Sequence, residues 1–200
     1  MSARNSPMQI MSSDEKTIKD FWTWQISIPC LPEGEHPMDD REGDNWSNGQ
    51  SMKEPVIYLS GAGGRNVRRT CTIPAGKRIL IPVMTVVATE KEYPGWSVAE
   101  MAEIAKWDQD NVKTLSLTID YDRYTLEDLK QFRKHTGDFP VEFPKDGIFG
   151  VAEGGSCKAV ADGYYLLTEA LTPGTYKIHF KGTIPCVPFR EDVDYTLTVK

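Results

Sequence analysis

The chain has 200 residues and a mass of 22.5 kDa, with 40% hydrophobic and 26% charged residues, which excludes a mainly disordered protein. Its 23 basic residues against 29 acidic ones give a net charge of -6, and this argues against nucleic-acid binding, which requires clustered positive charge. The longest apolar stretch, residues 79–88, is about half the ~20 residues that a membrane-spanning helix requires.

The N-terminal residues 1–16 are polar and contain no apolar run of the kind found in a secretory signal. The sequence as written therefore predicts a cytoplasmic protein, or an exported one if a signal has been trimmed. We expect residues 1–19 to form a flexible N-terminal segment and residues 20–200 to form a single domain.

Strand patterns dominate the rest of the chain. Pro82 lies inside a long apolar strand and predicts a bulge or break, because proline cannot donate a ladder hydrogen bond. Asp162-Gly163 predicts a turn within another apolar run. The predicted strands, from alternation and apolar runs, are 22–28, 56–59, 67–73, 77–88, 115–120, 141–143, the run 159–171 with its turn, 175–182 and 193–200.

Two helices interrupt the strands. Ser97 and Glu100 have the spacing of a capping box and predict a helix over about 97–112. Thr125 starts a shorter predicted helix that reaches about 134. The pattern as a whole predicts a mainly all-β fold, an antiparallel β-sandwich with jelly-roll character and two inserted helices.

The four cysteines are far apart and form no C-x-x-C pair, which is poor spacing for a zinc site. In a reducing compartment they are expected to be free thiols, and in an exported protein they could form two disulfides. The sequence leaves both alternatives open for Cys30, Cys71, Cys157 and Cys186.

A series of short motifs resembles a family of small, β-rich, mostly exported prokaryotic proteins with no assigned activity. The motifs are W-x-W at 22–24, HP at 36–37, GQ at 49–50, R-x-C-x-IPAGK at 69–77, ADGYY at 161–165 and PG-x-Y-x-IHF at 173–180. The resemblance covers roughly residues 20–199, implies a single fold unit and supplies no catalytic residues. Members often have a cysteine shortly before the Gly-Gln pair, where this chain has Trp46. The resemblance thus implies that Cys71 is unpaired or pairs differently, as suits a reducing compartment.

An acidic loop around Gly43 offers the hard oxygen donors that calcium or another divalent metal prefers. It lacks the spacing and terminal glutamate of an EF-hand, and a solvated loop with local turns is the alternative. The candidate metal ligands are Asp39, Asp40, Glu42 and Asp44.

The glycine-rich loop 60–64 is followed by Arg65 and Arg69, which with the loop amides could bind an anion. A strand follows the loop, whereas a dinucleotide site requires a helix there, so a flexible hairpin loop is the alternative. Trp46 and Trp96 also lie in predicted loops, where we expect them to be partly exposed and to contact a ligand.

A second candidate site combines His36 with Glu90 and Glu92, which follow the long apolar strand. Histidine and paired carboxylates suit acid–base catalysis, with or without a metal. His179 is expected on the solvent-facing side of its strand, beside Lys177 and Lys181.

No Ser-His-Asp order, phosphate-binding loop or Cys-His pair stands out. The leading hypothesis is therefore a non-enzymatic binding or interaction module that recognises a small or carbohydrate-like ligand through its loops. An enzyme with the His36 and carboxylate site is the first alternative. A structural or self-assembling protein is the second, since sheet edges mediate oligomer contacts.

Overall fold

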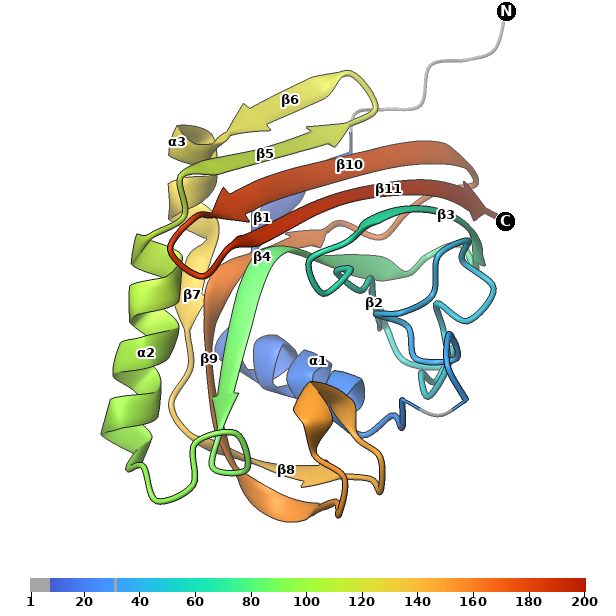
Figure 1. Cartoon of the computed structure of the whole chain (residues 1–200). Helices are drawn as coiled ribbons and strands as arrows, with labels where there is room; N and C mark the ends of the chain where they lie inside the picture. The colour runs from blue at the N-terminus through green and yellow to red at the C-terminus, as the bar shows by residue number, and fades with distance from the viewer. Residues whose placement is uncertain (1–7, 31) are drawn as a thin grey trace, which may run out of the picture.

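The computed structural model describes residues 8–30 and 32–200. Its described part contains 42% strand and 18% helix, arranged as two sheets with helices packed around them (Figure 1), which confirms the predicted mainly-β sandwich with inserted helices. No helix in these residues is both long enough and apolar enough to cross a membrane.

The first sheet, sheet A, is built around one long strand. The strand β9 pairs with β1, β4, β7 and β8, and β4 also pairs with β2. The bounds are β1 (Ile10–Ser12), β2 (Val56–Tyr58), β4 (Arg78–Thr89), β7 (Arg133–His135), β8 (Phe139–Phe143) and β9 (Gly155–Thr168).

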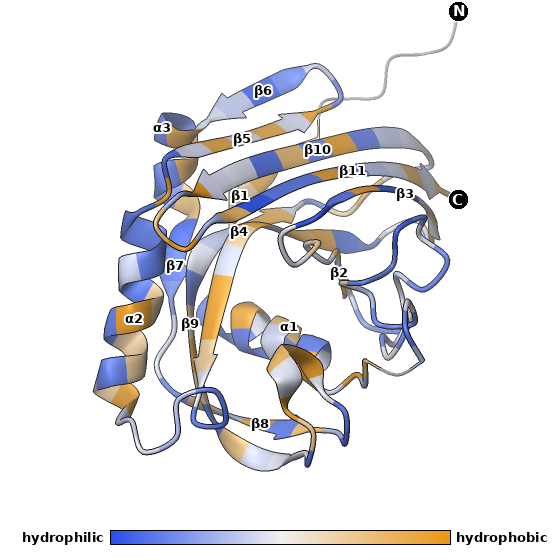
Figure 2. Cartoon of the chain, in the orientation of Figure 1, coloured by the Kyte–Doolittle hydropathy of each residue, from blue (hydrophilic) through white to orange (hydrophobic). Residues whose placement is uncertain are grey.

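The second sheet, sheet B, has the strand order β3-β11-β10-β5-β6. The pairs β3–β11 and β2–β4 are parallel and the other pairs are antiparallel, so the sandwich is mixed; a jelly-roll arrangement stays a prediction. Figure 2 shows hydrophobic and hydrophilic residues alternating along β10 and β11, because one face meets the core and the other meets solvent. The bounds are β3 (Asn66–Ile73), β5 (Thr114–Ile119), β6 (Asp122–Thr125), β10 (Gly174–Ile184) and β11 (Phe189–Val199).

Sheet A is buried on both faces, which explains the long apolar run in β4. Ile79 and Ile81 point into the core between the sheets, whereas Leu80 points into a second core against the helix α1 (Glu15–Ile26). The register shifts between Pro82 and Met84, which confirms the predicted bulge.

Residues 22–28 were predicted as a strand, and this prediction is wrong because most of them belong to α1. The carboxylate of Asp14 accepts from the Thr17 amide at 2.7 Å and caps the helix. Buried residues recur at helical spacing from Ile18 through Phe21 and Trp22. Alternation of Trp22 and Trp24 reflects two buried sides of a helix, and not the faces of a strand.

The predicted turn at Asp162-Gly163 is also wrong, because both residues lie within the continuous strand β9. Gly163 has φ +156°, and a Cβ there would lie 2.6 Å from the Cα of Thr85 on β4. Glycine is needed at this position for a close approach of two strands, as is common beside a bulge.

Helix α2 (Val98–Asp110) carries the predicted capping box of Ser97 and Glu100. The second predicted helix is shorter than expected, because α3 (Leu126–Leu129) and a 3₁₀ turn end at Phe132 and β7 follows. Within the segment predicted to be flexible, residues 10–12 form β1 and α1 begins at Glu15; residues 1–7 lie outside the described part.

The four cysteines are free thiols: Cys71 is buried, Cys30 and Cys157 are half-buried, and Cys186 is exposed. The structure thus agrees with the thiol alternative and places no disulfide among them.

Candidate functional site

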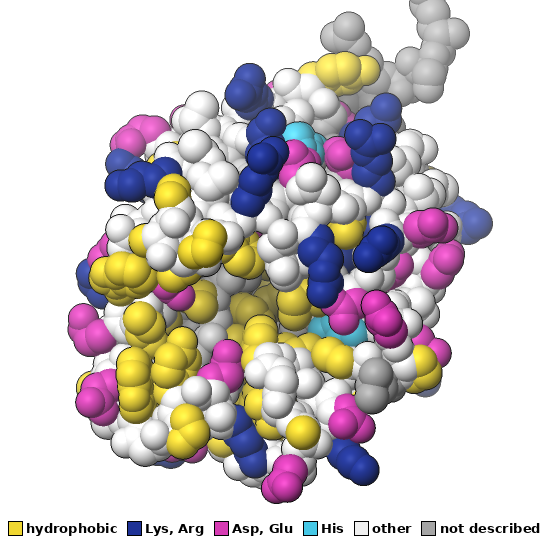
Figure 3. Space-filling view, in the orientation of Figure 1, with side chains coloured by type: hydrophobic (Ala, Val, Ile, Leu, Met, Phe, Trp, Pro, Cys, Tyr) yellow, Lys and Arg dark blue, Asp and Glu magenta, His cyan; other side chains and the backbone are white. Residues whose placement is uncertain are grey.

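A cavity of about 280 Å³ opens between α1, β4, the loop after β2 and the first residues of β11. Figure 3 shows a hollow lined by hydrophobic side chains on this face of the molecule. We call it the carboxyl cavity, because three acidic side chains line it: Glu92, Asp108 and Glu191. Five aromatic side chains form much of its remaining wall, namely Phe21, Trp22, Tyr93, Phe149 and Phe189.

Glu191 enters the cavity from β11. It shares the inward-facing register of Val193 and Tyr195, which places a carboxyl at a core position. Its Oε2 accepts from the Ala62 amide at 3.0 Å, and a Cβ at position 61 would lie 3.1 Å from the same oxygen. Burial raises the pKa of Glu191 to about 7 and outweighs the opposing effect of the Arg69 charge.

Glu92 and Asp108 reach the cavity from the turn after β4 and from α2. Glu92 Oε2 accepts from the Thr89 hydroxyl at 3.0 Å, and burial raises its pKa to about 7. The Oδ1 atom of Asp108 is buried without a hydrogen-bond partner, and burial raises the pKa of this carboxyl as well. Both groups therefore retain protons to a higher pH than exposed carboxyls.

Gln25 lines the cavity from α1 and is 1% exposed. Its Oε1 accepts from the Ser60 hydroxyl at 3.1 Å, whereas its Nε2 is buried without a partner. An unpaired buried amide costs free energy. The Nε2 group of Gln25 can therefore donate a stabilising hydrogen bond to a bound ligand.

His36 supports α1 from outside the cavity. Its Nδ1 accepts from the Met38 amide at 3.1 Å, so its Nε2 carries the proton and donates to the Gln25 carbonyl at 3.0 Å. The ring is fully buried, and burial lowers its pKa. His36 is thus a neutral structural histidine whose two nitrogens are both occupied, and it does not line the cavity with Glu92.

Arg69 is 1% exposed and joins the loops behind the cavity. Its guanidinium donates to the carbonyls of Met38, Asp40, Ser60 and Gly61, at 2.6–3.1 Å, and to the Tyr195 hydroxyl. These bonds hold the loops in place. The guanidinium donors are used within the protein, so they are not directed at an anion as the sequence analysis predicted.

The other predicted ligand-binding residues lie apart from the cavity. Trp46 is 8% exposed and packs in the core, so the prediction of exposure is wrong for it. Trp96 is 41% exposed, as predicted, and its ring lies 4.6 Å from that of Tyr93. Arg65 forms an ion pair with Asp39. Glu90 accepts from the Lys158 amide at 2.8 Å, and it does not line the cavity with Glu92.

The acidic loop uses one of its carboxylates to hold its own backbone. Asp40 accepts from the amides of Glu42, Gly43 and Asn45 at 2.9–3.2 Å, as in the local turns of the alternative interpretation. The carboxylates of Glu42 and Asp44 form no hydrogen bond or ion pair in the described structure. Calcium binding by this loop stays a prediction.

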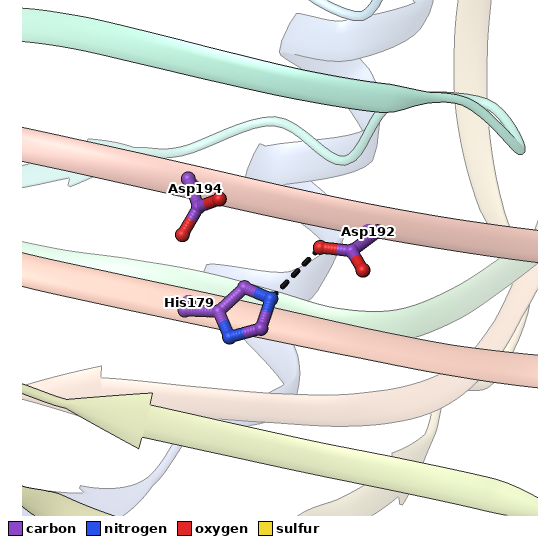
Figure 4. Close-up of side chains that lie close together, drawn as sticks. All are labelled: His179, Asp192 and Asp194. Carbon is purple, nitrogen blue, oxygen red and sulfur yellow. Dashed lines mark hydrogen bonds and ion pairs between the residues drawn. The ribbon is translucent and has the colours of Figure 1, made fainter.

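Within the described residues, three potential metal ligands lie close together elsewhere, on the solvent-facing side of sheet B. The ligand atoms of His179, Asp192 and Asp194 are all within 4.8 Å of one another (Figure 4). His179 Nε2 and Asp192 Oδ1 are 2.8 Å apart, and Arg68 Nε lies 3.8 Å from Asp194. These polar contacts account for the arrangement without a metal ion.

The same side of sheet B carries a larger, open groove of about 440 Å³. Its basic lining residues are Lys113, Arg123, Lys181 and Arg190. Glu191 also lines this groove, but there it lies beside basic side chains, whereas no basic side chain among the described residues lines the carboxyl cavity.

Sequence analysis missed Glu191 and Asp108, although each breaks a visible pattern. Extending the alternation of β11 back from Tyr195 and Val193 places Glu191 on the inward face. Asp108 follows Met101 and Ala105 at helical spacing on the buried side of α2. An acidic residue at a position reserved for apolar side chains was the available signal.

Comparison with known proteins identifies no family. No family model and no curated protein match the chain. A solved structure titled "Structure of PbICP-C in complex with falcipain-2" is 14% identical over 74% of this chain and 100% of that chain, with a TM-score of 0.29. The "Solution Structure of Amebosin" is 14% identical over 68% of this chain and 97% of that chain, with a TM-score of 0.20. Similarities this low carry no inference about function.

Proposed function

We propose that the chain is a binding module for a small organic molecule, which it holds in the carboxyl cavity. The observation that carries the proposal is an aromatic-walled cavity lined by one buried and two half-buried carboxyl groups that form no ion pair. Among the described residues, no lysine, arginine or histidine lines this cavity. Folding buries such groups at a cost, which a bound ligand can offset.

The shape and strain of the cavity also support a ligand. Its volume of about 280 Å³ is near the lower end of the range of roughly 300–1,000 Å³ seen for small-molecule sites. Phe149 lines the cavity with φ +60°, in the left-handed region that a bulky side chain rarely adopts. Backbone strain of this kind is concentrated at functional sites.

The test is a small-molecule screen read by thermal shift on the wild-type chain and two matched variants. Val86 lines the cavity, whereas Val187 is 41% exposed and does not. Val86→Phe should abolish the shifts caused by cavity ligands, and Val187→Phe should leave them unchanged. Ligands that survive Val86→Phe, or a screen without ligands, would contradict the proposal.

A second candidate function is acid–base catalysis in the same cavity. It is favoured by the pKa of about 7 at both Glu92 and Glu191, since a carboxyl with such a pKa exchanges protons efficiently near neutral pH. A panel of aryl glycosides and aryl esters would test it. Turnover that is lost in both Glu92→Gln and Glu191→Gln would support an enzyme, and the absence of turnover would leave binding alone.

A further inference from the structure

The charge of the carboxyl cavity is one-sided. Glu92, Asp108 and Glu191 make no ion pair with any basic residue in the described part of the chain. The buried Arg69 lies behind Glu191 and gives its donors to carbonyls and to Tyr195. When these carboxyls ionise, the charge of Arg69 acts on Glu191 from behind, but no basic side chain among the described residues faces them across the cavity, so a cationic ligand could supply that charge.

The aromatic wall suits a positive charge that keeps apolar groups around it. The faces of aromatic rings attract cations, most strongly where water is excluded. Trp22 and Phe21 come from α1, Tyr93 from the turn after β4, and Phe149 and Phe189 from two further loops or strand ends. Rings from separate elements thus line one space, and sites that hold ammonium ions are also lined by aromatic rings.

An independent observation adds a second group to the ligand. Gln25 is 1% exposed and lines the cavity, and its Nε2 has no partner among the described atoms. Its Oε1 is held by Ser60, which fixes the orientation of the amide. A free amide donor would form a hydrogen bond with an acceptor oxygen on the ligand.

We propose that the carboxyl cavity binds a small organic ammonium ion that also carries an oxygen acceptor, such as a hydroxyl group. This inference rests on the proposed binding function and names its ligand class. The ammonium group lies against the carboxylates and the aromatic rings, and the oxygen accepts from the Gln25 amide.

The experiment compares charged probes with neutral ones of the same shape by titration calorimetry. The charged probes are choline and phenylethanolamine, and the neutral probes are their carbon isosteres, in which carbon replaces the nitrogen. At least one charged probe should bind about tenfold or more tighter than its isostere, equivalent to roughly 1.4 kcal/mol. Binding of neither charged probe would overturn the proposal.

Variants locate the binding. Glu191→Gln and Glu92→Gln should each weaken the charged probe about tenfold or more while leaving the neutral isostere unchanged. Glu169→Gln, at an exposed residue outside the cavity, is the matched control. An equal loss of affinity for the charged probe in all three variants would contradict binding of the ammonium group in the carboxyl cavity.

Phe149→Gly separates binding from folding, because glycine accepts the positive φ and removes the ring. It should weaken the charged probes and leave the chain folded. Asp146→Gly is the control, since Asp146 also has a positive φ, of 56°, in the same loop but does not line the cavity.

The outcomes distinguish this inference from the function on which it rests. If the neutral isosteres bind as tightly as the charged probes and Val86→Phe abolishes both, small-molecule binding stands and the ammonium proposal fails. If no compound in the screen responds to Val86→Phe, both fail. Tighter binding of Nα-acetyl-lysine amide, which keeps its side-chain ammonium group, than of either free ammonium probe would assign the cavity to a lysine side chain of a partner protein and would overturn the proposal that the ligand is a free small molecule.

Discussion

Arg69 donates to the hydroxyl of Tyr195 at 2.6 Å, and its guanidinium lies 5.3 Å from the centre of the same ring. The two residues face each other across the parallel pair β3–β11, in direct register. The Tyr195 hydroxyl in turn donates to the Ser60 carbonyl at 2.9 Å. One buried pair thereby ties a sheet to the loop that carries the Ala62 amide and the back of the carboxyl cavity.

Arg69→Met should lower the free energy of unfolding by about 3 kcal/mol or more, because four carbonyl groups and a hydroxyl lose a charged donor inside the protein. Tyr195→Phe should cost less, about 1–2 kcal/mol. Urea unfolding at neutral pH measures both. Arg68→Met serves as the control, since the Arg68 side chain is 90% exposed, and it should stay within about 0.5 kcal/mol of the wild type.

Gly163→Ala should destabilise the chain by about 2 kcal/mol or more, since a Cβ would collide with the backbone of β4 and the residue has a positive φ. Thermal unfolding by circular dichroism is a sufficient measurement. Gly137→Ala is a suitable comparison, because a Cβ there would make ordinary contacts, at 3.5 Å with the Glu15 carboxylate and 4.0 Å with Lys19 Nζ. Equal stability of the two variants would contradict the close approach of β9 and β4.

The free energy of unfolding of the wild type should fall as the pH rises from about 5 to about 7, because the pKa of Glu92 and of Glu191 is raised to about 7 in the folded chain. In this range the unfolded chain has released protons that the half-buried Glu92 and the buried Glu191 still hold in the folded chain. The folded state thus binds more protons, and each such carboxyl lowers the unfolding free energy by at most about 1.4 kcal/mol per pH unit. His36 acts in the opposite direction: burial lowers its pKa, so its share of the stability is lost as the pH falls below the unfolded value of about 6.5.

Glu191→Gln removes the contribution of one carboxyl to the pH dependence of the unfolding free energy. The Ala62 amide and the Arg69 charge act on this group, and Asp108, Glu92 and His36 titrate from the neighbouring elements. Relative to the wild type, the variant should become progressively more stable from about pH 5 to about pH 7. Urea unfolding across this range measures the difference, and a pH-independent difference would show that Glu191 titrates normally.

Thiol labelling should distinguish the cysteines. Cys186 is exposed, whereas Cys71 is buried and burial raises its pKa to about 12. A chromogenic disulfide reagent should label Cys186 rapidly and Cys71 only after denaturant is added. Cys186→Ser should remove the fast phase. Rapid labelling of Cys71 in the native protein would contradict its place in the core.

The sheets were largely predictable from the sequence, because β3, β10 and β11 alternate cleanly and β4 is apolar on both faces. Helix α1 was not, since the pair Trp22 and Trp24 fits a strand as well as a helix when read without Ile18 and the Asp14 cap. Glu90 and Glu92 were predicted to form one acid–base pair, but the turn directs their side chains to different surroundings. Only Glu92 reaches the cavity, and its partners come from α2 and β11, far away in sequence.

The late position of β9 and β11 in the sequence has a consequence for how the chain folds during synthesis. β9 holds the N-terminal β1 by matching Ile10 with Thr168, and β11 holds β3 by matching Asn66 with Asp192. A ribosome must therefore synthesise most of the protein before either sheet can close. Until then the apolar residues of β4 stay exposed to solvent or to a chaperone, and contacts so distant in sequence make folding slow. A protein shortened by its last strand would lose a central member of sheet B, and with Glu191 it would lose the carboxyl cavity.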